Sequence, residues 1–165
     1  MRRGETWKET IGYWTYRGLE SVAMSLPERI GRRVFSVFAR LAHATLDGVR
    51  RTVAANQARV LGLDPDDERV GLSTRDAFDL YSRYWFDTFR IRVMSADEVN
   101  RRTRMIDADN IDRALERGKG CVAVLPHMGN WDLAGHWFAL HGYRIAAVAE
   151  ELRPARLSEL FLRHR

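Results

Sequence analysis

The chain has 165 residues, enough for one domain with its own core, and its 45% hydrophobic and 30% charged residues exclude an intrinsically disordered chain. Its net charge of +5, from 27 basic and 22 acidic residues, favours phosphate-rich partners such as nucleic acid, anionic lipid or a phosphorylated cofactor. The one cysteine, Cys121, excludes an internal disulfide and a cysteine-based metal site.

The first part of the chain is expected to be helical, because its apolar residues recur every three to four positions. This spacing predicts four long helices, over about residues 5–25, 27–46, 49–61 and 74–93. The last of them carries aromatic residues around much of its circumference, so we expect it to be buried on several sides and to form the spine of this part. A capping box that begins at Ser95 predicts a shorter helix after it.

The helix predicted over residues 5–25 carries Trp7, Ile11, Trp14 and Val22 on one face. This face could pack into the core, or it could lie on a membrane surface with its rings at the depth of the lipid headgroups. Core packing is the favoured interpretation, because the face is narrow and nearby glutamates dilute the positive charge. No stretch reaches the roughly 18 uncharged apolar residues of a transmembrane helix, and no signal peptide is recognised.

From about residue 103 the pattern changes to alternating strands and helices. It predicts strands at 103–106, 121–125 and 143–149, with helices at about 111–117, at about 129–141 and from 155 onward. Such alternation predicts an α/β fold, in which an N-terminal helical segment is followed by the start of a largely parallel sheet flanked by helices. Cys121, in the second of these strands, is expected to be a small core residue.

The predicted elements divide the chain into two portions. Residues 1–102 form a helical N-terminal portion, and residues 103–165 form the first half of an α/β core. Two or three strands are fewer than a sheet normally contains. We therefore expect one incomplete domain, which is the first part of a longer one.

The stretch most suggestive of chemistry follows the strand at 121–125. Pro126 ends the strand, His127 comes next, and Asp132 stands five positions later. A histidine can take a proton from a hydroxyl near neutral pH, and a carboxylate on its other ring nitrogen fixes its tautomer. The pair therefore predicts direct attack by an acceptor hydroxyl on an acyl carbon. Two residues alone, however, do not favour a catalytic pair. The better interpretation is that His127 is an ordinary loop histidine and Asp132 an ordinary aspartate at the start of a helix.

A metal site is the second specific hypothesis for this region, because His136 and His141 stand close to His127 and Asp132 in the sequence. The arrangement of two histidines flanking a glutamate that is typical of metalloproteases is absent. No metal site is therefore expected.

The segment Leu125-Pro-His-Met-Gly-Asn-Trp-Asp132, preceded by Gly118-Lys-Gly120, resembles the lysophospholipid acyltransferase superfamily, whose hallmark is a histidine, four residues and an acid. The Gly-Asn-Trp within it resembles the lipid A lauroyl/myristoyl acyltransferase branch. Asp132 in place of glutamate, and the composition rich in Arg and Ala, are most similar to the actinobacterial phosphatidylinositol mannoside acyltransferases. The stretch Arg50–Asn56 resembles the Arg-rich helix of that branch. The resemblance covers nearly the whole chain, but about the first half of the family domain.

The resemblance implies an acyl-CoA-dependent O-acyltransferase of glycolipid biosynthesis, which moves a fatty acyl group to a sugar hydroxyl of a phosphatidylinositol mannoside. It implies that His127 is the general base and Asp132 its orienting partner, with Asn130, Arg153 and Arg165 binding substrate. Acyl-CoA is a co-substrate, and no cofactor is implied. Further glutamate and proline motifs of the family are expected beyond residue 165.

The implied partners are acyl-CoA, a membrane glycolipid acceptor and an anionic membrane surface, with no nucleic acid. The implied location is peripheral, on the cytoplasmic side of the cell membrane. Two alternatives stay open: acyl transfer to another glycolipid or a lysophospholipid, and a non-enzymatic basic module that binds anionic membrane or nucleic acid. Substitution of His127 separates the enzyme from the module, because only the enzyme depends on that base.

Overall fold

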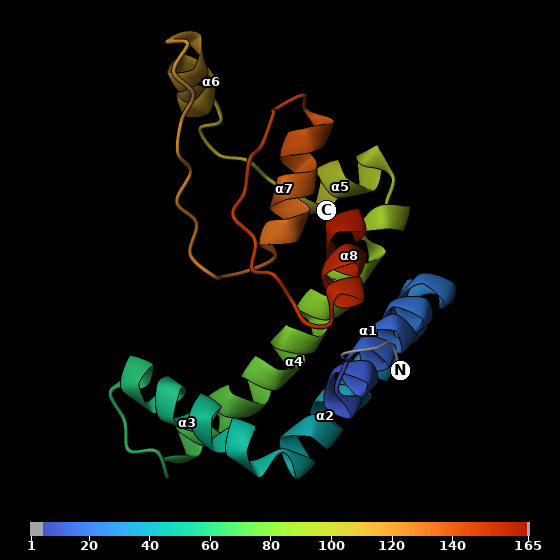
Figure 1. The fold of residues 1–165 in the computed structure, drawn as a ribbon. Helices are drawn as coiled ribbons and strands as arrows, with labels where there is room; N and C mark the ends of the chain where they lie inside the picture. Colours follow the sequence, from blue (N-terminus) through green and yellow to red (C-terminus); the bar gives the residue numbers. More distant parts are fainter. Residues whose placement is uncertain (1–4, 165) are drawn as a thin grey trace. The chain divides into compact units, whose positions relative to one another are not determined.

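The computed structural model describes residues 5–164, and the regular structure within this range is helical throughout. The α-helices labelled in Figure 1 are α1 (Trp7–Ser25), α2 (Glu28–Thr45), α3 (Asp47–Leu61), α4 (Glu68–Arg90), α5 (Ala96–Arg102), α6 (Asp109–Glu116), α7 (Trp131–Leu140) and α8 (Ala155–His164). A short 3-10 helix, η1 (Ile91–Val93), lies between α4 and α5. The chain divides into two compact units, one ending at Arg90 and one beginning at Ile91.

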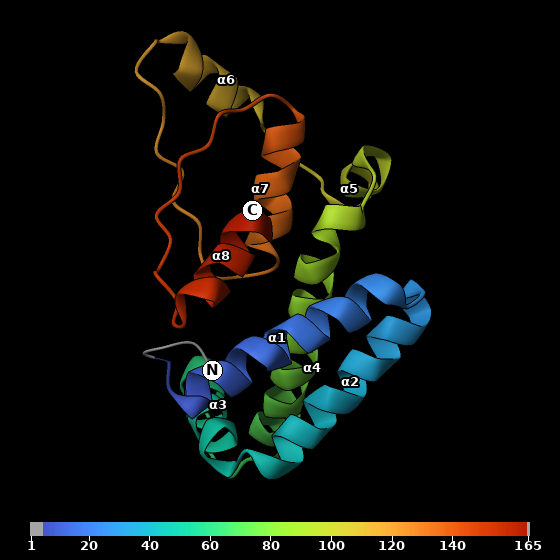
Figure 2. The ribbon, with the colours of Figure 1, turned by 45° about the vertical axis from the view of Figure 1, so that its right-hand side comes forward.

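The first unit is built around α4, the aromatic helix expected to be its spine. Helices α1, α2 and α3 each pack against α4, and Figures 1 and 2 show them gathered around it. The buried side chains of Ala23, Phe35, Phe86 and Phe89 form the core of this unit. The rings of Phe35 and Phe86 meet edge to face with their centroids 5.2 Å apart, a favourable arrangement for two aromatic rings. Burial of α4 on several sides follows from these contacts.

Helix α4 begins at Glu68, earlier than the sequence pattern predicts. In the preceding turn, Asp67 Oδ1 accepts a hydrogen bond of 2.9 Å from the backbone N–H of Arg69, which satisfies a donor at the helix start. Hydrogen bonds from the Arg69 side chain and backbone lower the pKa of Asp67 to about 2, so this carboxylate is charged at neutral pH. Ser73, a residue type that often caps helices, lies inside α4, where its hydroxyl donates to Gln57 Oε1 at 2.7 Å and links α4 to α3.

The face of α1 that is expected to pack into the core does so only in part. Trp7 and Trp14 are 63% and 61% exposed, so the favoured interpretation is wrong for these two residues, whereas Val22 packs against the core cluster. Helix α1 buries the side that carries Tyr16, Val22 and Ala23, which meet the core cluster, and this leaves the two tryptophans outside.

Polar contacts complete the attachment of α1 and α2 to α4. Arg90 donates to the carbonyl oxygens of Ala23 and Leu26 at 2.9 and 3.1 Å, groups at the end of α1 that lack partners within the helix. Arg32 of α2 pairs with Asp87 of α4 at 2.7 Å. These bonds fix how the three helices meet.

A glycine allows α2 to approach α4 closely. A Cβ atom placed on Gly31 would lie 2.4 Å from Cε2 of the buried Phe86 ring. Gly31→Ala is therefore expected to destabilise the protein by about 1–2 kcal/mol, because overpacking outweighs the gain in helix propensity. Urea unfolding followed by circular dichroism measures this change.

The matched control for this prediction is Gly12→Ala in α1, where a new Cβ meets nothing within 4 Å. The same substitution there should stabilise by up to about 1 kcal/mol, since alanine restricts the unfolded chain and favours the helix. Equal stabilisation of both variants would contradict the close approach of α2 and α4 at Gly31.

The second unit contains η1 and α5 to α8, and within it α5 packs against α7. The capping box predicted at Ser95 is present in part: the Ser95 hydroxyl accepts a hydrogen bond of 3.2 Å from the N–H of Glu98. The Tyr143 hydroxyl donates to Asp112 Oδ1 at 2.7 Å and ties the segment after α7 to α6. This bond raises the pKa of Tyr143, because it stabilises the neutral phenol beside a carboxylate.

The predicted α/β fold is wrong for this structure. No strand is present within residues 5–164. Irregular segments between helices take the place of the three predicted strands, at 103–106, 121–125 and 143–149. Val122 and Val124 are 91% and 88% exposed, and Cys121 is exposed instead of buried in a core. A strand requires a neighbouring strand for its N–H and C=O groups, and a short apolar run does not reveal whether one is there.

Candidate active site

His127 lies at the centre of a tight turn just before α7. The N–H of Met128 donates to the carbonyl oxygen of Pro126 at 2.7 Å, which closes a three-residue turn around His127. Gly129 follows with a φ of 67°, a left-handed conformation that glycine adopts without strain. The turn therefore holds the His127 side chain at an exposed position, while the chain reverses into the helix.

The start of α7 is set by Asn130. Its side-chain oxygen accepts a hydrogen bond of 2.9 Å from the N–H of Leu133, the usual bond of a helix N-cap. Asp132 therefore falls in the first turn of α7, half-buried, where the helix dipole favours a carboxylate. The structure assigns Asn130 a capping bond that the sequence reasoning did not foresee, although an Asn three residues before an apolar helical residue signals it.

The His127 ring meets Trp131 edge to face, with the ring centroids 4.9 Å apart. Among residues 5–164 the ring makes no hydrogen bond, so the predicted bond to Asp132 is not formed here. The structure thus brings together His127, Trp131 and Asp132 at one helix start. Their catalytic roles stay predictions.

Arg153 is exposed and directly precedes Pro154, the last residue before α8. The segment before it is tied to α8, because the N–H of Leu152 donates to Ser158 Oγ at 2.6 Å and this hydroxyl donates to the Leu152 carbonyl oxygen at 3.0 Å. Arg165, the other arginine predicted to bind substrate, lies outside the described residues. No described contact connects Arg153 with the His127 turn in the part of the chain that the structure covers.

The two other histidines of this region belong to α7 and its end. His136 is half-buried, and His141 stacks on Trp137 with centroids 3.8 Å apart while its Nδ1 lies 2.8 Å from the Trp137 carbonyl oxygen. Over residues 5–164, no three side chains of the His, Cys, Asp or Glu types gather as a metal site requires.

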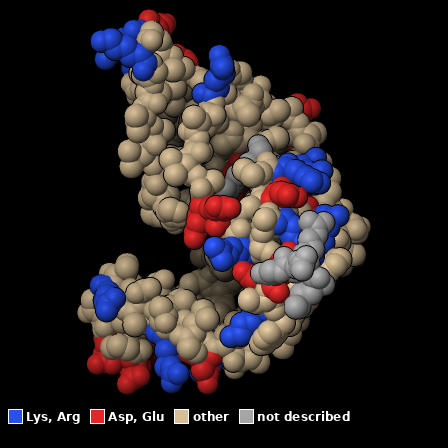
Figure 3. All heavy atoms as spheres, viewed as in Figure 1, with Lys and Arg blue, Asp and Glu red and all other residues tan. Residues whose placement is uncertain are grey.

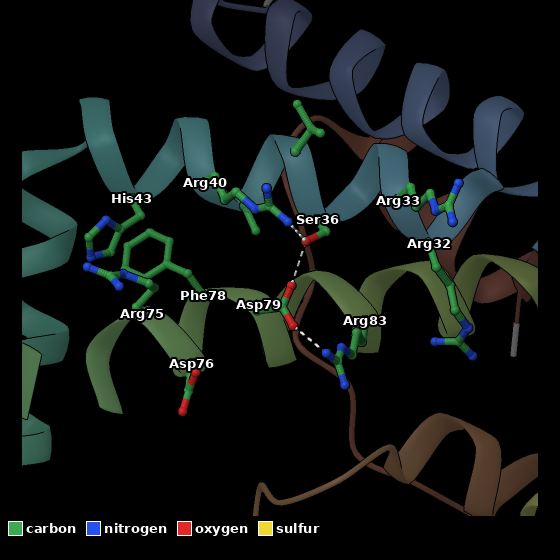
Figure 4. A pocket seen from close by; sticks show the side chains of 12 residues that line it. Arg32, Arg33, Ser36, Arg40, His43, Arg75, Asp76, Phe78, Asp79 and Arg83 are labelled. Carbon is green, nitrogen blue, oxygen red and sulfur yellow. Dashed lines mark hydrogen bonds and ion pairs between the residues drawn. The ribbon is translucent and has the colours of Figure 1, made fainter. Parts of the chain in front are cut away.

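The sequence reasoning missed an open hollow of about 1180 Å³ between α2 and α4 (Figure 4). Five arginines line it: Arg32, Arg33, Arg40, Arg75 and Arg83. The signal that could have indicated it is the recurrence of arginine on α2 beside an apolar face. The opposite wall, however, comes from a helix that is distant in the sequence.

The charged side chains are mixed on the face of the molecule drawn in Figure 3, where blue and red groups are interspersed. The excess of arginine therefore forms no continuous basic field on that face. None of the helices within residues 5–164 combines the length and apolar character needed to cross a membrane.

Comparison with known proteins gives a consistent result. The family profile described as bacterial lipid A biosynthesis acyltransferase matches residues 5–165. A phosphatidylinositol mannoside acyltransferase of Mycolicibacterium smegmatis (strain ATCC 700084 / mc(2)155) is 36% identical over 141 residues, which cover 86% of this chain and 45% of that protein. The phosphatidylinositol mannoside acyltransferase of Mycobacterium tuberculosis (strain ATCC 25618 / H37Rv) is 34% identical over 154 residues, which cover 92% of this chain and 48% of that protein. The chain thus spans about half the length of these relatives. The resemblance inferred from the motif is confirmed.

Proposed function

Because the chain belongs to the bacterial lipid A biosynthesis acyltransferase family, we propose that it transfers a fatty acyl group from acyl-CoA to a sugar hydroxyl of a phosphatidylinositol mannoside. The observation that carries this proposal is the identity of 34–36% with relatives named for that acceptor. Another glycolipid or a lysophospholipid would undergo the same chemistry, so these acceptors become outcomes of the test below.

In the proposed reaction His127 removes the proton from the acceptor hydroxyl. The hydroxyl oxygen forms a bond to the thioester carbon, the carbon–sulfur bond breaks, and the proton passes from the imidazolium to the CoA thiolate. The thioester is already activated, so neither a covalent enzyme intermediate nor a cofactor is required. The exposed position of His127 at the tip of a turn supports this role, because a membrane lipid must reach the base.

Asp132 is proposed to orient the His127 ring and to stabilise the imidazolium. In support, both residues project from the same short segment, and the Asn130 cap fixes Asp132 in the first turn of α7. In the reacting state the ring would turn from its contact with Trp131 toward this carboxylate. A contact between Asn130 and substrate rests on the resemblance and is part of the proposal.

Arg153 and Arg165 are proposed to bind phosphate groups of CoA or of the acceptor, because a guanidinium pairs with phosphate oxygens in a bidentate manner. The proposed location is the cytoplasmic side of the cell membrane, where the protein is peripheral. The exposed Trp7 and Trp14 on α1 support the contact with a membrane surface, since indole rings favour the depth of the lipid headgroups.

The test is an acyl transfer assay with palmitoyl-CoA and four separate acceptors: phosphatidylinositol mannoside, phosphatidylinositol, a different glycolipid and a lysophospholipid. We expect mass spectrometry to find an acylated product with the mannoside, in an amount equal to the CoA thiol released. Without an acceptor, thiol release should stay at background. A product with a different acceptor alone would replace the proposed substrate, and no product with any acceptor would contradict the enzymatic function.

A further inference from the structure

The hollow between α2 and α4, here called the α2–α4 groove, is rich in cationic side chains that the proposed reaction does not use. Its walls come from residues 32–43 of α2 and 75–83 of α4. Ser36 and Asp79 join the walls by a hydrogen bond of 2.9 Å (Figure 4). Three elements of the groove decide what it can bind: its charge balance, its histidine and its apolar border.

The charge balance of the groove leaves a positive excess. Arg83 pairs with Asp79 at 2.6 Å, and Arg32 pairs with Glu28 and Asp87 at 2.8 and 2.7 Å. These two arginines are therefore neutralised.

The remaining arginines of the groove, Arg33, Arg40 and Arg75, form no ion pair with any residue from 5 to 164. Asp76 also borders the groove, but Figure 4 shows its carboxylate pointing away from α2. An anionic ligand would supply the missing negative charge.

His43 lies at one end of the groove, close to positively charged arginines. Burial lowers the pKa of His43, and the nearby Arg50 and Arg75 lower it further. Figure 4 shows Arg75 beside the His43 and Phe78 rings. His43 is thus favoured as a neutral imidazole, which can donate or accept a hydrogen bond with a phosphate oxygen without adding charge.

An exposed apolar stripe borders the groove. Ile30, Val37 and Leu41 are about half exposed and lie seven and four positions apart, so they share one face of α2. Val37 also lines the groove, and Arg33 and Arg40 form a parallel row beside the stripe. A helix with an apolar face next to an arginine row lies in the plane of an anionic bilayer, with arginine on the phosphates.

We propose that the α2–α4 groove binds the phosphate of an anionic phospholipid headgroup, while the stripe formed by Ile30, Val37 and Leu41 enters the bilayer interface beside it. The apolar border favours a lipid over a soluble phosphate ester, because a soluble ligand gains nothing from that face. This assignment rests on the proposed function only in placing the protein at a membrane, and it concerns residues remote in sequence from His127.

The test is co-sedimentation of the protein with vesicles of phosphatidylcholine alone and of an equimolar mixture with phosphatidylglycerol. The variant Arg33→Gln/Arg40→Gln/Arg75→Gln should partition to the mixed vesicles about a hundredfold more weakly, since each basic residue at an anionic surface contributes to binding. The variant Val37→Asn/Leu41→Asn should also bind the mixed vesicles more weakly than the parent protein. This loss should persist at high salt. Circular dichroism checks that both variants keep the helical fold.

The matched control is Arg59→Gln/Arg104→Gln/Arg117→Gln, which removes the same charge from exposed positions outside the groove. It should keep binding within about threefold, since distant surface charges are screened. Equal losses in both triple variants would overturn the groove assignment. Calorimetric binding of CoA or inorganic phosphate that depends on the three groove arginines, without vesicles, would overturn the lipid assignment. His127→Ala should bind vesicles normally, so failure of the acyl transfer proposal stays distinguishable from failure of this one.

Discussion

Replacing His127 with alanine is expected to lower acyl transfer by about 10²–10⁴-fold, the usual contribution of general base catalysis. The side chain is exposed at the tip of a turn and makes no hydrogen bond to residues 5–164, so the substitution removes no structural bond from the described part of the chain. The loss should appear in kcat with little change in KM. Product formation from palmitoyl-CoA and the mannoside acceptor, followed by mass spectrometry, measures it.

His136→Gln is the matched control, because it replaces a half-buried histidine of α7 that has no proposed role. Transfer by this variant should stay within about threefold of the parent, as for most substitutions away from a catalytic group. Asp132→Asn gives a finer test. Without the carboxylate the imidazolium that forms during transfer loses its proposed stabilising partner, so kcat should drop while KM changes little. Normal transfer by His127→Ala would contradict the mechanism.

Replacing Phe86 with alanine is expected to destabilise the protein by about 3–5 kcal/mol, because the cavity left by a buried phenylalanine does not close. The Phe86 ring is fully buried between Arg32 and Arg90, whose guanidinium carbons lie 5.2 and 5.5 Å from the ring centroid. It also packs edge to face on Phe35 and lies against Gly31. A single substitution therefore disturbs the contacts of α2 with α4. Urea unfolding followed by circular dichroism measures the loss.

Leu80→Ala is the control for this prediction, because it truncates another large apolar residue of α4 that is 60% exposed. Its effect should stay within about 0.5 kcal/mol, as for most surface substitutions. If the two variants unfold at the same urea concentration, the packing of α4 in the core of the first unit is wrong.

The helical part of the fold could be predicted from the sequence because its signals are local. Apolar spacing predicted α1 to α4 and the central position of α4, and the box at Ser95 predicted the start of α5. The predicted start of α4 was less accurate, because two residues near it can each cap a helix. Asp67 and Ser73 are both good caps, and the turn before α4 uses Asp67.

The predicted sheet shows where local reasoning fails. An apolar run such as Cys121–Leu125 is compatible with a strand, but a strand also needs paired backbone groups from another segment. That pairing is a property of the whole fold and cannot be read from the run itself. The exposed positions of Trp7 and Trp14 have the same cause, since helical spacing reveals a face but not which neighbour covers it.

The sequence by itself determined the helices of the first unit, the family, and the residues proposed for catalysis, because helix periodicity and the His127–Asp132 segment are contained in short stretches. Only the tertiary structure decided the fit of Gly31 against Phe86 and the α2–α4 groove. Each of these joins α2 to side chains of α4 that lie more than 30 positions away, as the Ser36–Asp79 bond does with a separation of 43. Contacts of that kind form when helices pack, and no local pattern encodes them.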